Sequence, residues 1–564
     1  MKLKFFVVLI ASSLLTEGLA FNAETELIID ELIENYFMRY NRIPGLGVSV
    51  VRNGTVLMSK GYGMKNVTAG LPSDGNTLFA IGSITKSFVA ILVVRTLNEL
   101  YPDRGSAILD IPLAELIPDT VNFTLSDRYR AEHTTFRDIL THRTCLSNGG
   151  VHLILGSLPS ASEYAYRSRY LPEICEFRNG FEYNNHMLSL AGETIAAIAG
   201  TTLQDLVTDF ANELGMENTT YVDFDGSYES SPDMSQPYVL RDDVLVEFDI
   251  FQIRKVHMAL GAGGILSTAN DMAKYMNFHL NLGLVDGRQI VPANVMNWLY
   301  TVGYPFDFRG GRTDEIGSIV YGDLGTAQGL FSTLYDGWNI IHHGGYWPPY
   351  HCDMRLFQAT RIGVFICANG PGVIFNFPTH EITAYSIFEL IRGSTKSIEQ
   401  ILSSKVNLGK PFVEHQFAYG HRTNRAPTVL HHKQIRTTVE PEDVLGVYGH
   451  PYDGDVTIRY DPETNNTALQ VFFSDWAYGR LEQVPGFNTT FSIEWQTSFN
   501  DHFYSYPFPI PSFWVDFGVV DTALFRGGEF DLYDEFEYVK NATLDTFPPI
   551  PWPPTSCGPE TLHH

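Results

Sequence analysis

The sequence predicts a layered α/β fold followed by a separate β-rich domain, and three observations support this class. Strand-like segments lie near both ends of the region that runs to residue 391, and helical segments lie between them. Strands from both ends of a region that join one sheet, with helices inserted, are typical of an α/β layered architecture. From Val444 to Tyr538 apolar and polar residues alternate between turn signals, which predicts the second domain.

A helix and a β-hairpin open the first domain. Residues Glu24–Tyr40 carry a helical stripe of apolar side chains that Pro44-Gly45 ends. The runs Leu46–Arg52 and Thr55–Lys60 are rich in strand-forming residues, and the Asn-Gly pair between them is a strong hairpin signal.

Helices dominate the middle of the chain, and strands return before its first domain ends. Ser87–Leu100 is apolar nearly all round, which predicts a helix buried inside the domain. The other clear elements are helices at Thr135–Leu140 and Met187–Ile198, strands within Leu330–Asn369, and a closing helix at Tyr385–Ile391. The predicted boundaries are a signal peptide at 1–20, the α/β domain at 21–392, a linker at 393–440, the β-rich domain at 441–545 and a proline-rich tail at 546–564.

The composition describes a globular and strongly acidic protein. The 564 residues are 44% hydrophobic and 18% charged, which suffices for several domains with large cores. Asp and Glu number 64 against 38 Lys and Arg, so the formal net charge is −26. Nucleic acid and anionic membranes are therefore not expected partners. The acidity also suits binding of Ca²⁺ or mineral, although solubility is the simpler explanation.

The N-terminus predicts a secreted protein. Lys2 and Lys4 precede the apolar run Phe5–Leu15, and small residues at Gly18 and Ala20 suit signal cleavage after Ala20. The run is too short to span a bilayer, so we expect no transmembrane segment; a membrane anchor at the N-terminus is the alternative. Asn-x-Ser/Thr sequons for N-glycosylation stand at Asn53, Asn66, Asn122, Asn218, Asn465, Asn488 and Asn541.

The five cysteines suit an oxidising compartment. Cys352 and Cys367 flank two predicted strands whose turn lies midway between them, so they face each other at bridging distance. Cys145 and Cys175 are candidates for a second bridge, worth on the order of 3–4 kcal/mol. Cys557 is then left over. Sequence does not fix this connectivity, and buried free thiols are the alternative.

Ser83 and Lys86 form the first candidate catalytic pair. Residues three apart at the start of a helix share one face, so the lysine amine can reach the serine hydroxyl. A buried lysine with a lowered pKa can deprotonate a serine nucleophile. Taken alone, a Ser-x-x-Lys pattern also occurs by chance in a chain of this length.

Two further segments carry candidate site residues. Tyr183 and Asn185 stand just before a predicted helix, where a Tyr-x-Asn turn can supply a phenol for proton relay and an amide for a substrate carbonyl. The segment His342-His343-Gly344-Gly345 opens a strand whose glycines let a substrate approach backbone N–H groups. Paired histidines also suggest a metal, but no carboxylate or thiolate lies at ligand spacing, so we expect none.

These motifs, in this order, resemble the serine β-lactamase and penicillin-binding protein family, in the branch of class C β-lactamases, D-alanyl-D-alanine carboxypeptidases and related esterases. The family motifs Ser-x-x-Lys, Tyr-x-Asn and Lys/His-x-Gly correspond to Ser83–Lys86, Tyr183–Asn185 and His342 or His343 with its glycine. The resemblance extends over roughly Ile43–Asn369 and implies an antiparallel sheet flanked by helices, with a helical subdomain. The segment Leu445–Tyr448 resembles the lipocalin-like β-domain that many of these proteins carry.

The resemblance also implies roles. Ser83 would be acylated, Lys86 would assist its deprotonation, Tyr183 would pass protons to the leaving group and activate the deacylating water, and Asn185 would orient the substrate. The oxyanion hole would combine the backbone N–H of Ser83 with that of Gly345 or Tyr346. This chemistry requires no metal or organic cofactor.

The third motif departs from the family pattern. Both His342-His343-Gly344 and His343-Gly344-Gly345 fit it, and the second places Tyr350 where the family has an aromatic residue. Histidine in place of lysine weakens the fixed charge that would hold a β-lactam or peptide carboxylate. Within the family, this favours an esterase or peptidase over a β-lactamase.

Two functions from different classes follow. The first is a secreted serine hydrolase that acts through an acyl-enzyme on an ester, amide or peptide substrate. The second is an extracellular matrix protein that uses the fold for structure or binding, because the acidic, sequon-rich chain also resembles the gigasin-type shell-matrix proteins of molluscs, which carry a β-lactamase-like domain.

Overall fold

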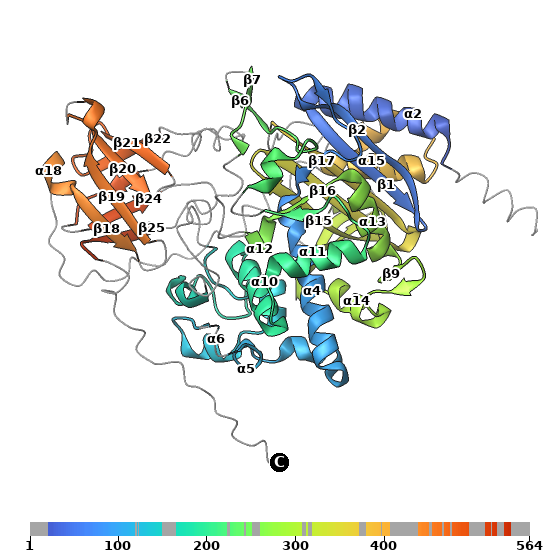
Figure 1. Cartoon of the computed structure of the whole chain (residues 1–564), viewed down its shortest axis with the longest axis horizontal. Coiled ribbons are helices and arrows are strands. Elements are labelled where there is room, and N and C mark those ends of the chain that lie inside the picture. Colours follow the sequence, from blue (N-terminus) through green and yellow to red (C-terminus); the bar gives the residue numbers. More distant parts are fainter. Residues whose placement is uncertain are drawn as a thin grey trace, which may run out of the picture.

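The computed structural model describes two folded regions (Figure 1). The described residues are 21–118, 121, 123–148, 165–222, 226–241, 244–250, 260–306, 312–313, 319–371, 380–395, 397–405, 438–450, 454–464, 467–473, 477–495, 514–519, 522–526 and 535–542. The predicted signal peptide, most of the predicted linker, the proline-rich tail, Asn122, Asn465 and Cys557 lie outside these ranges.

The predicted first helix and hairpin are both confirmed. Segments α2 (Ala23–Glu31), η1 (Leu32–Met38) and α3 (Arg39–Asn41) follow one another as a helix that Asn22 caps through Thr25 N–H. Strands β1 (Gly45–Arg52) and β2 (Thr55–Asn66) pair antiparallel. The turn residues between them have positive φ angles of 51° and 82°, which an Asn-Gly pair adopts readily.

A ten-stranded sheet forms the framework of the first region. Its path runs β11-β13-β14-β15-β16-β17-β1-β2-β3, with β12 paired to β13. The N-terminal hairpin therefore joins the C-terminal strands, and Leu46 pairs with Ala368 across β1 and β17. The remaining bounds are β3 (Leu71–Pro72), β11 (Tyr304–Pro305), β12 (Arg312–Thr313), β13 (Ile319–Ala327), β14 (Leu330–Tyr335), β15 (Trp338–Trp347), β16 (Tyr350–Phe357) and β17 (Ile362–Ala368).

Helices cover both faces of this sheet, which confirms the layered architecture. On one face, α15 (His380–Ile391) and the N-terminal helix pack on alternate residues of β1 and β17. Helix α16 (Ile398–Lys405) buries Ile398, Ile401 and Leu402 in the same core. The described part of the predicted linker therefore contains a helix that packs on the first region.

The opposite face carries the helical part of the molecule around α4 (Thr85–Leu100). This helix is buried from Thr85 to Val94, as its apolar sequence predicts, and α10 and α14 pack against it. The other helices are α5 (Leu113–Leu116), α6 (Arg128–His133), α7 (Phe136–Leu140), α10 (Asn185–Ala199), α11 (Leu203–Glu213), α12 (Leu260–Gly263), α13 (Ala269–Leu280) and α14 (Ala293–Tyr300). Short strands are β4 (Phe79–Ala80), β5 (Thr220–Tyr221), β6 (Tyr238–Arg241), β7 (Val244–Glu247), β8 (Ile265–Ser267), β9 (Leu284–Val285) and β10 (Arg288–Gln289).

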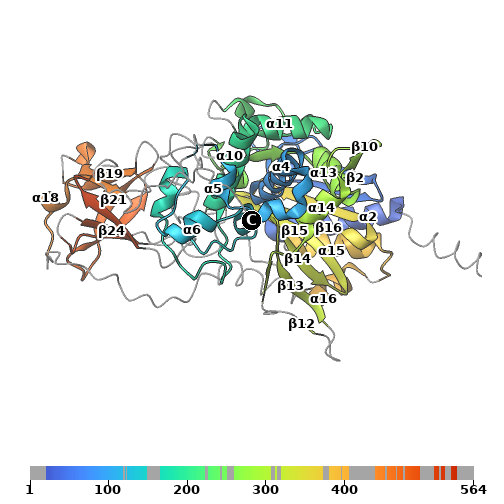
Figure 2. The same ribbon diagram turned by 90° about the horizontal axis from the view of Figure 1, so that it is seen from below.

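The second region is a closed antiparallel barrel, β18 to β25 (Figure 2). It closes where β18 pairs with β25, at Tyr448 opposite Lys540. Inward-facing residues such as Tyr448, Val471 and Trp495 form its own core, as the alternating pattern predicts. After α18 (Pro441–Val444), its strands are β18 (Gly446–His450), β19 (Gly454–Tyr460), β20 (Leu469–Phe473), β21 (Ala477–Gln483), β22 (Thr490–Trp495), β23 (Trp514–Asp516), β24 (Thr522–Arg526) and β25 (Glu535–Lys540).

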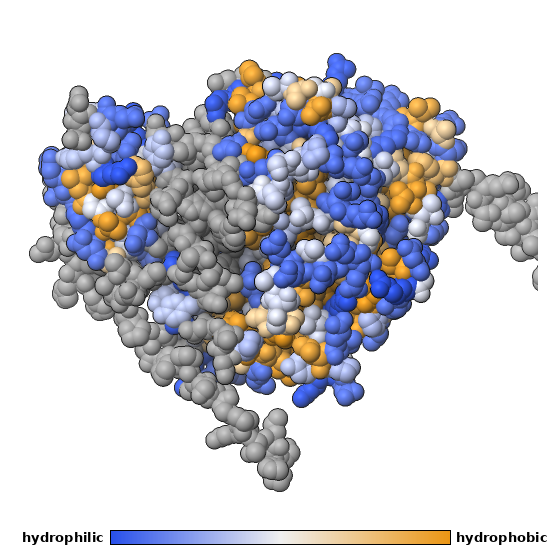
Figure 3. Space-filling view, viewed as in Figure 1, coloured by the Kyte–Doolittle hydropathy of each residue, from blue (hydrophilic) through white to orange (hydrophobic). Residues whose placement is uncertain are grey.

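Hydrophilic residues cover most of the described surface seen in Figure 3, and hydrophobic residues appear there in scattered groups. Among the described helices, none has the length and hydropathy needed to cross a membrane. Of the sequon asparagines in the described ranges, Asn53, Asn218, Asn488 and Asn541 are exposed and Asn66 is half-buried. Glycosylation at these positions stays a prediction.

Candidate active site

Ser83 lies at the start of the buried helix α4. It belongs to the short helical turn η2 (Gly82–Ile84) and keeps part of its surface exposed. The approach to this turn is fixed because β4 pairs with β8 and Ile81 N–H donates to Ile265 O at 3.0 Å. A rigid turn at the head of a buried helix presents the hydroxyl in one place.

Lys86 follows on the same face of the helix, as the three-residue spacing predicts. Its Nζ lies 2.9 Å from Ser83 Oγ and 2.9 Å from the carbonyl oxygen of Ala262, to which it donates. The side chain is fully buried and forms no ion pair with a described residue. Burial alone lowers the pKa of the Lys86 amine well below its usual value, because a desolvated ammonium is costly.

Tyr183 completes a cluster with these two residues. Its ring centroid lies 4.8 Å from Lys86 Nζ, and its hydroxyl is close enough to Ser83 for the serine to influence the pKa of the phenol. Burial raises the pKa of the Tyr183 phenol above its usual value, and the interaction with Ser83 only partly offsets this. The phenol therefore keeps its proton at neutral pH, and the neighbouring amine loses its proton at a lower pH than an exposed lysine does.

The cap of helix α10 holds Tyr183 and Asn185 in position. Asn184 accepts from Met187 N–H at 2.9 Å, and its Nδ2 donates to the carbonyl oxygens of Leu146 and Ser147 at 2.9 and 3.0 Å. The side-chain amide of Asn185 is half-buried and hydrogen-bonds no other described residue.

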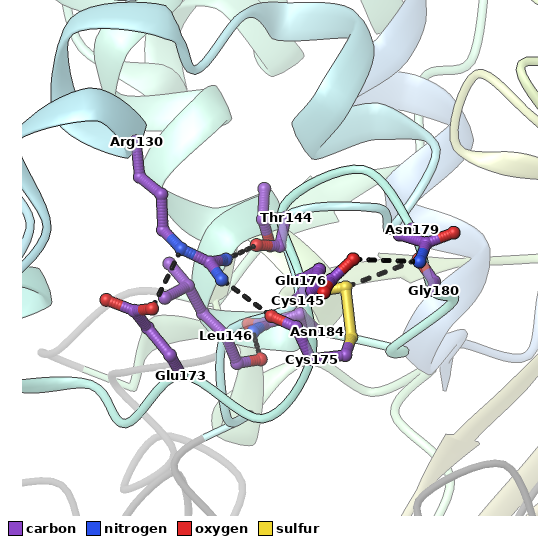
Figure 4. The surroundings of a disulfide bond; sticks show 10 residues. All are labelled: Arg130, Thr144, Cys145, Leu146, Glu173, Cys175, Glu176, Asn179, Gly180 and Asn184. Carbon is purple, nitrogen blue, oxygen red and sulfur yellow. Dashed lines mark hydrogen bonds and ion pairs between the residues drawn. A yellow bond between two sulfur atoms is a disulfide. The ribbon is translucent and has the colours of Figure 1, made fainter.

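A bridged loop supports this cap (Figure 4). The structure joins Cys145 to Cys175, whose separation is 30 residues. Arg130, beside the bridge, donates to the carbonyl oxygens of Thr144 and Cys175 at 2.7 and 2.6 Å and pairs with Glu173. These bonds fasten the segment before Tyr183 to the segment after α7.

The second bridge joins Cys352 to Cys367 on β16 and β17. The two residues are direct partners in the strand register, as the position of the predicted turn implies. Cys352 Sγ lies 3.5 Å from the carbonyl oxygen of Ala80, directly before the turn that holds Ser83. This bridge therefore lies beneath the serine and outside the reacting cluster.

The two histidines of the third motif lie on opposite faces of β15. His343 faces the cluster, with its ring centroid 6.2 Å from that of Tyr183. His342 faces the other way, where its Nε2 lies 2.7 Å from Thr333 Oγ1. Burial, with a smaller contribution from the nearby Lys86, lowers the pKa of His343 to about 3, so this imidazole is neutral at physiological pH. The geometry thus brings His343, and not His342, to the side of β15 that faces Tyr183.

Glycines let β15 approach the serine turn closely. A Cβ at Gly345 would lie 2.0 Å from Ile81 O, and a Cβ at Gly82 would lie 2.7 Å from backbone N of Tyr346. Gly82 also has a φ of +53°, which favours glycine. Gly344 points to the other face, where a Cβ would meet nothing closer than 3.9 Å. Backbone amides of the strand and the serine turn are therefore adjacent.

Aromatic side chains that the motifs do not contain surround the cluster. Phe331 stacks at 6.3 Å from Tyr183 and lies 5.2 Å from His343, measured between ring centroids. Phe181 contacts Phe306 at 4.9 Å. Phe181 precedes Tyr183 by two residues, so its closeness to the motif could have indicated it from the sequence. Phe306 and Phe331 come from distant segments that contain no motif.

His142 is a further residue that the motifs did not single out for chemistry. It follows α7, and its ring centroid lies 4.6 Å from that of Tyr183. Burial and the nearby Lys86 and His343 lower its pKa well below the usual histidine value.

Within the described ranges, no three His, Cys, Asp or Glu side chains are grouped as metal ligands would be.

Comparison with known proteins agrees with this geometry. The sequence profile of the beta-lactamase family matches residues 29–384. Unguisins hydrolase ungD of Aspergillus violaceofuscus is 26% identical over 359 residues, which are 58% of this chain and 58% of the fungal protein. Gigasin-6 of Magallana gigas is 26% identical over 254 residues, which are 45% of this chain and 81% of that protein. This chain thus spans little more than half the length of the fungal relative.

The fold is also shared with a solved structure. The octameric penicillin-binding protein homologue from Pyrococcus abyssi superposes with a TM-score of 0.53 at 19% identity, over 92% of this chain and 99% of the archaeal one. The family profile covers more than half of the sequence, including all three motifs around Ser83. This chain belongs to the beta-lactamase family, whose members are serine hydrolases.

Proposed function

We propose that this protein hydrolyses an ester, amide or peptide bond through an acyl-enzyme on Ser83. The observation that carries this proposal is the 2.9 Å distance from Lys86 Nζ to Ser83 Oγ, with the lysine fully buried. A neutral amine at this distance can take the hydroxyl proton as the oxygen attacks the substrate carbonyl. The carbonyl-to-leaving-group bond then breaks, and water later hydrolyses the acyl-serine.

Tyr183 relays the proton between Lys86 and the leaving group. Its phenol stays protonated, so it can donate to the leaving oxygen or nitrogen and be reprotonated by the lysine. During deacylation the same groups act in reverse, taking a proton from the attacking water and returning one to Ser83 Oγ. In this scheme Lys86 is the base and Tyr183 is the carrier.

Backbone amides stabilise the negative charge that develops on the substrate oxygen. We assign the two donors to the N–H groups of Ser83 and Tyr346, because the close approach at Gly82 makes the strand and the turn adjacent. The amide of Asn185 and the ring of His343 orient the substrate.

The substrate is uncharged in the part that faces His343. A neutral imidazole stands where a lysine would hold a carboxylate, and the surrounding Phe181, Phe306 and Phe331 are apolar. Placing an unpaired carboxylate among these groups would require desolvation without a compensating cation. We therefore infer that neutral esters or amides with apolar groups are preferred to β-lactams or peptide carboxylates.

We further propose that the protein is secreted after cleavage behind Ala20 and is N-glycosylated. The N-terminal pattern, the sequons and the two bridges support this. The domain division into 21–392 and 441–545 is part of the same proposal, with α16 added to the first domain.

A role as an extracellular matrix protein is the second candidate function. The net charge of −26 and the similarity to Gigasin-6 favour it. Recovery of the protein from a mineralised or chitinous matrix, with no hydrolysis of any ester in a broad panel, would decide for this function and against the hydrolase.

The hydrolase proposal is tested by intact-mass spectrometry with a fluorophosphonate probe. The wild-type protein should gain one adduct, and Ser83→Ala should gain none while its melting temperature is unchanged. Ser106→Ala is the matched control because this serine is exposed and remote from the motifs; it should label like the wild type. A well-folded wild type without an adduct would overturn the proposal.

A further inference from the structure

His142 holds the backbone on both sides of Tyr183. The residue ends the α7 segment in the left-handed region, with a φ of +57°. Its carbonyl oxygen accepts from Glu182 N–H at 2.8 Å, and its ring Nδ1 accepts from Asn184 N–H at 2.9 Å. The two amides that flank Tyr183 are thus bound to one residue, and the histidine ring packs against the phenol ring between them.

The bond to Asn184 fixes the protonation of the imidazole. Because Nδ1 accepts a hydrogen bond, it carries no proton, and the single ring proton of the neutral form must be on Nε2. Protonation of Nδ1 would replace this bond with a clash between two donors and would place a cation beside Lys86. The buried surroundings and the neighbouring Lys86 both oppose that protonation.

Other bonds already anchor this region without the imidazole. The Cys145–Cys175 bridge joins the two segments, and Arg178 N–H donates to Arg143 O at 3.1 Å. Asp138, fully buried, pairs with both of these arginines. The loop is therefore anchored without the imidazole. The additional effect of the His142 ring is to position Tyr183, which lies between the two amides that His142 binds.

We propose that His142, in its Nε2-protonated form, is a positioning residue that holds the Tyr183 phenol against Ser83 for proton relay. The proposal rests on the acyl-enzyme function inferred above. His142 acts through Tyr183 and touches neither the nucleophile nor the leaving group, so its loss should affect the chemical steps more than substrate binding.

The test compares three substitutions in the full-length protein. In His142→Asn, the amide oxygen occupies nearly the place of Nδ1, and asparagine tolerates a positive φ. His142→Leu has no acceptor, and in His142→Gln the acceptor is displaced by one bond. We expect kcat of His142→Asn to stay within about threefold of the wild type. In His142→Leu and His142→Gln, kcat should fall about 10–100-fold while KM stays nearly unchanged. A loss of this size is part of what a general acid–base group contributes to the rate.

A double-mutant cycle separates positioning from a purely structural role. Because the histidine acts through the phenol, His142→Leu should cost almost nothing further in a Tyr183→Phe background. An equal loss in both backgrounds, or a His142→Asn variant as slow as His142→Leu, would overturn the proposal. If His142→Leu does not fold, comparing kcat of His142→Asn with kcat of His142→Gln tests the same point. Failure of the Ser83→Ala labelling experiment would instead refute the underlying function.

Discussion

The proton on Lys86 is the single-residue feature on which activity depends most directly. Burial lowers the pKa of this amine, and only the neutral amine can act as a base. We expect kcat/KM to fall as the pH drops through this lowered pKa, because the amine becomes protonated, and to rise again as the pH increases. A pH–rate profile with a neutral ester measures this limb.

Lys86→Arg is the sharpest control for that assignment. Arginine keeps a positive charge at this position but cannot lose its proton near neutral pH. We expect loss of acylation at every pH between about 5 and 9, because arginine stays protonated throughout this range. If the arginine variant showed the same fall of kcat/KM at low pH as the wild type, another group would be the base.

His343 determines which substrate charge the proposed site prefers. With its pKa lowered to about 3, it contributes no cation at physiological pH. A neutral ester should therefore exceed its carboxylate-bearing analogue in kcat/KM by about tenfold or more, since an unpaired buried charge costs at least the corresponding 1.4 kcal/mol. His343→Lys should narrow this difference, whereas equal rates for the two substrates in the wild type would contradict the assignment.

At the scale of elements, the approach of β15 to the serine turn controls the oxyanion donors. Gly345→Ala would place a Cβ 2.0 Å from Ile81 O and push the strand away from Ser83. We expect kcat to fall about 100-fold, comparable with the loss of one oxyanion donor. Gly344→Ala, on the open face of the same strand, is the matched control and should retain activity. Equal effects of the two substitutions would exclude this mechanism.

Elements with a local sequence signal were predictable, and those defined by distant contacts were not. The Asn-Gly hairpin, the buried helix α4 and the Cys352–Cys367 register each follow from spacing within one short stretch of the chain, at most 16 residues long. Helix α16 was missed because its short apolar face gains stability only by packing on α15 and the N-terminal helix. Its place in the fold depends on residues far away in the sequence.

The candidate site divides in the same way. Ser83, Lys86 and Tyr183 were found because each stands in a short motif, and the order of the motifs made the pattern specific. Phe331 had no motif, because its position depends on the path of β14 across the sheet. His142 had no signal of its own, since its bonds to the backbone beside Tyr183 exist only in the folded chain.

For the whole molecule, separate cores predict separate unfolding. The sheet region has cores on its two faces, whereas the barrel has a core of its own, formed by residues such as Tyr448 and Val515. We expect two transitions in differential scanning calorimetry. An adduct on Ser83 should raise the midpoint temperature of the sheet region's transition only, because it stabilises only the region that binds it. A single transition that shifts as a unit would show that the two regions unfold cooperatively.

The path of the sheet also determines when the protein can fold during its synthesis. Strand β1 carries residue 46 but pairs with residue 368 on β17, so the hairpin remains an unpaired edge until nearly the whole first region has been made. At about 5–20 residues per second, that wait is on the order of tens of seconds. Ribosome-bound chains therefore expose an apolar sheet edge for that time, and such an edge is prone to pair with other chains. The proposed active site can therefore form only after this late closure, because β15 and the serine turn belong to the region that closes last.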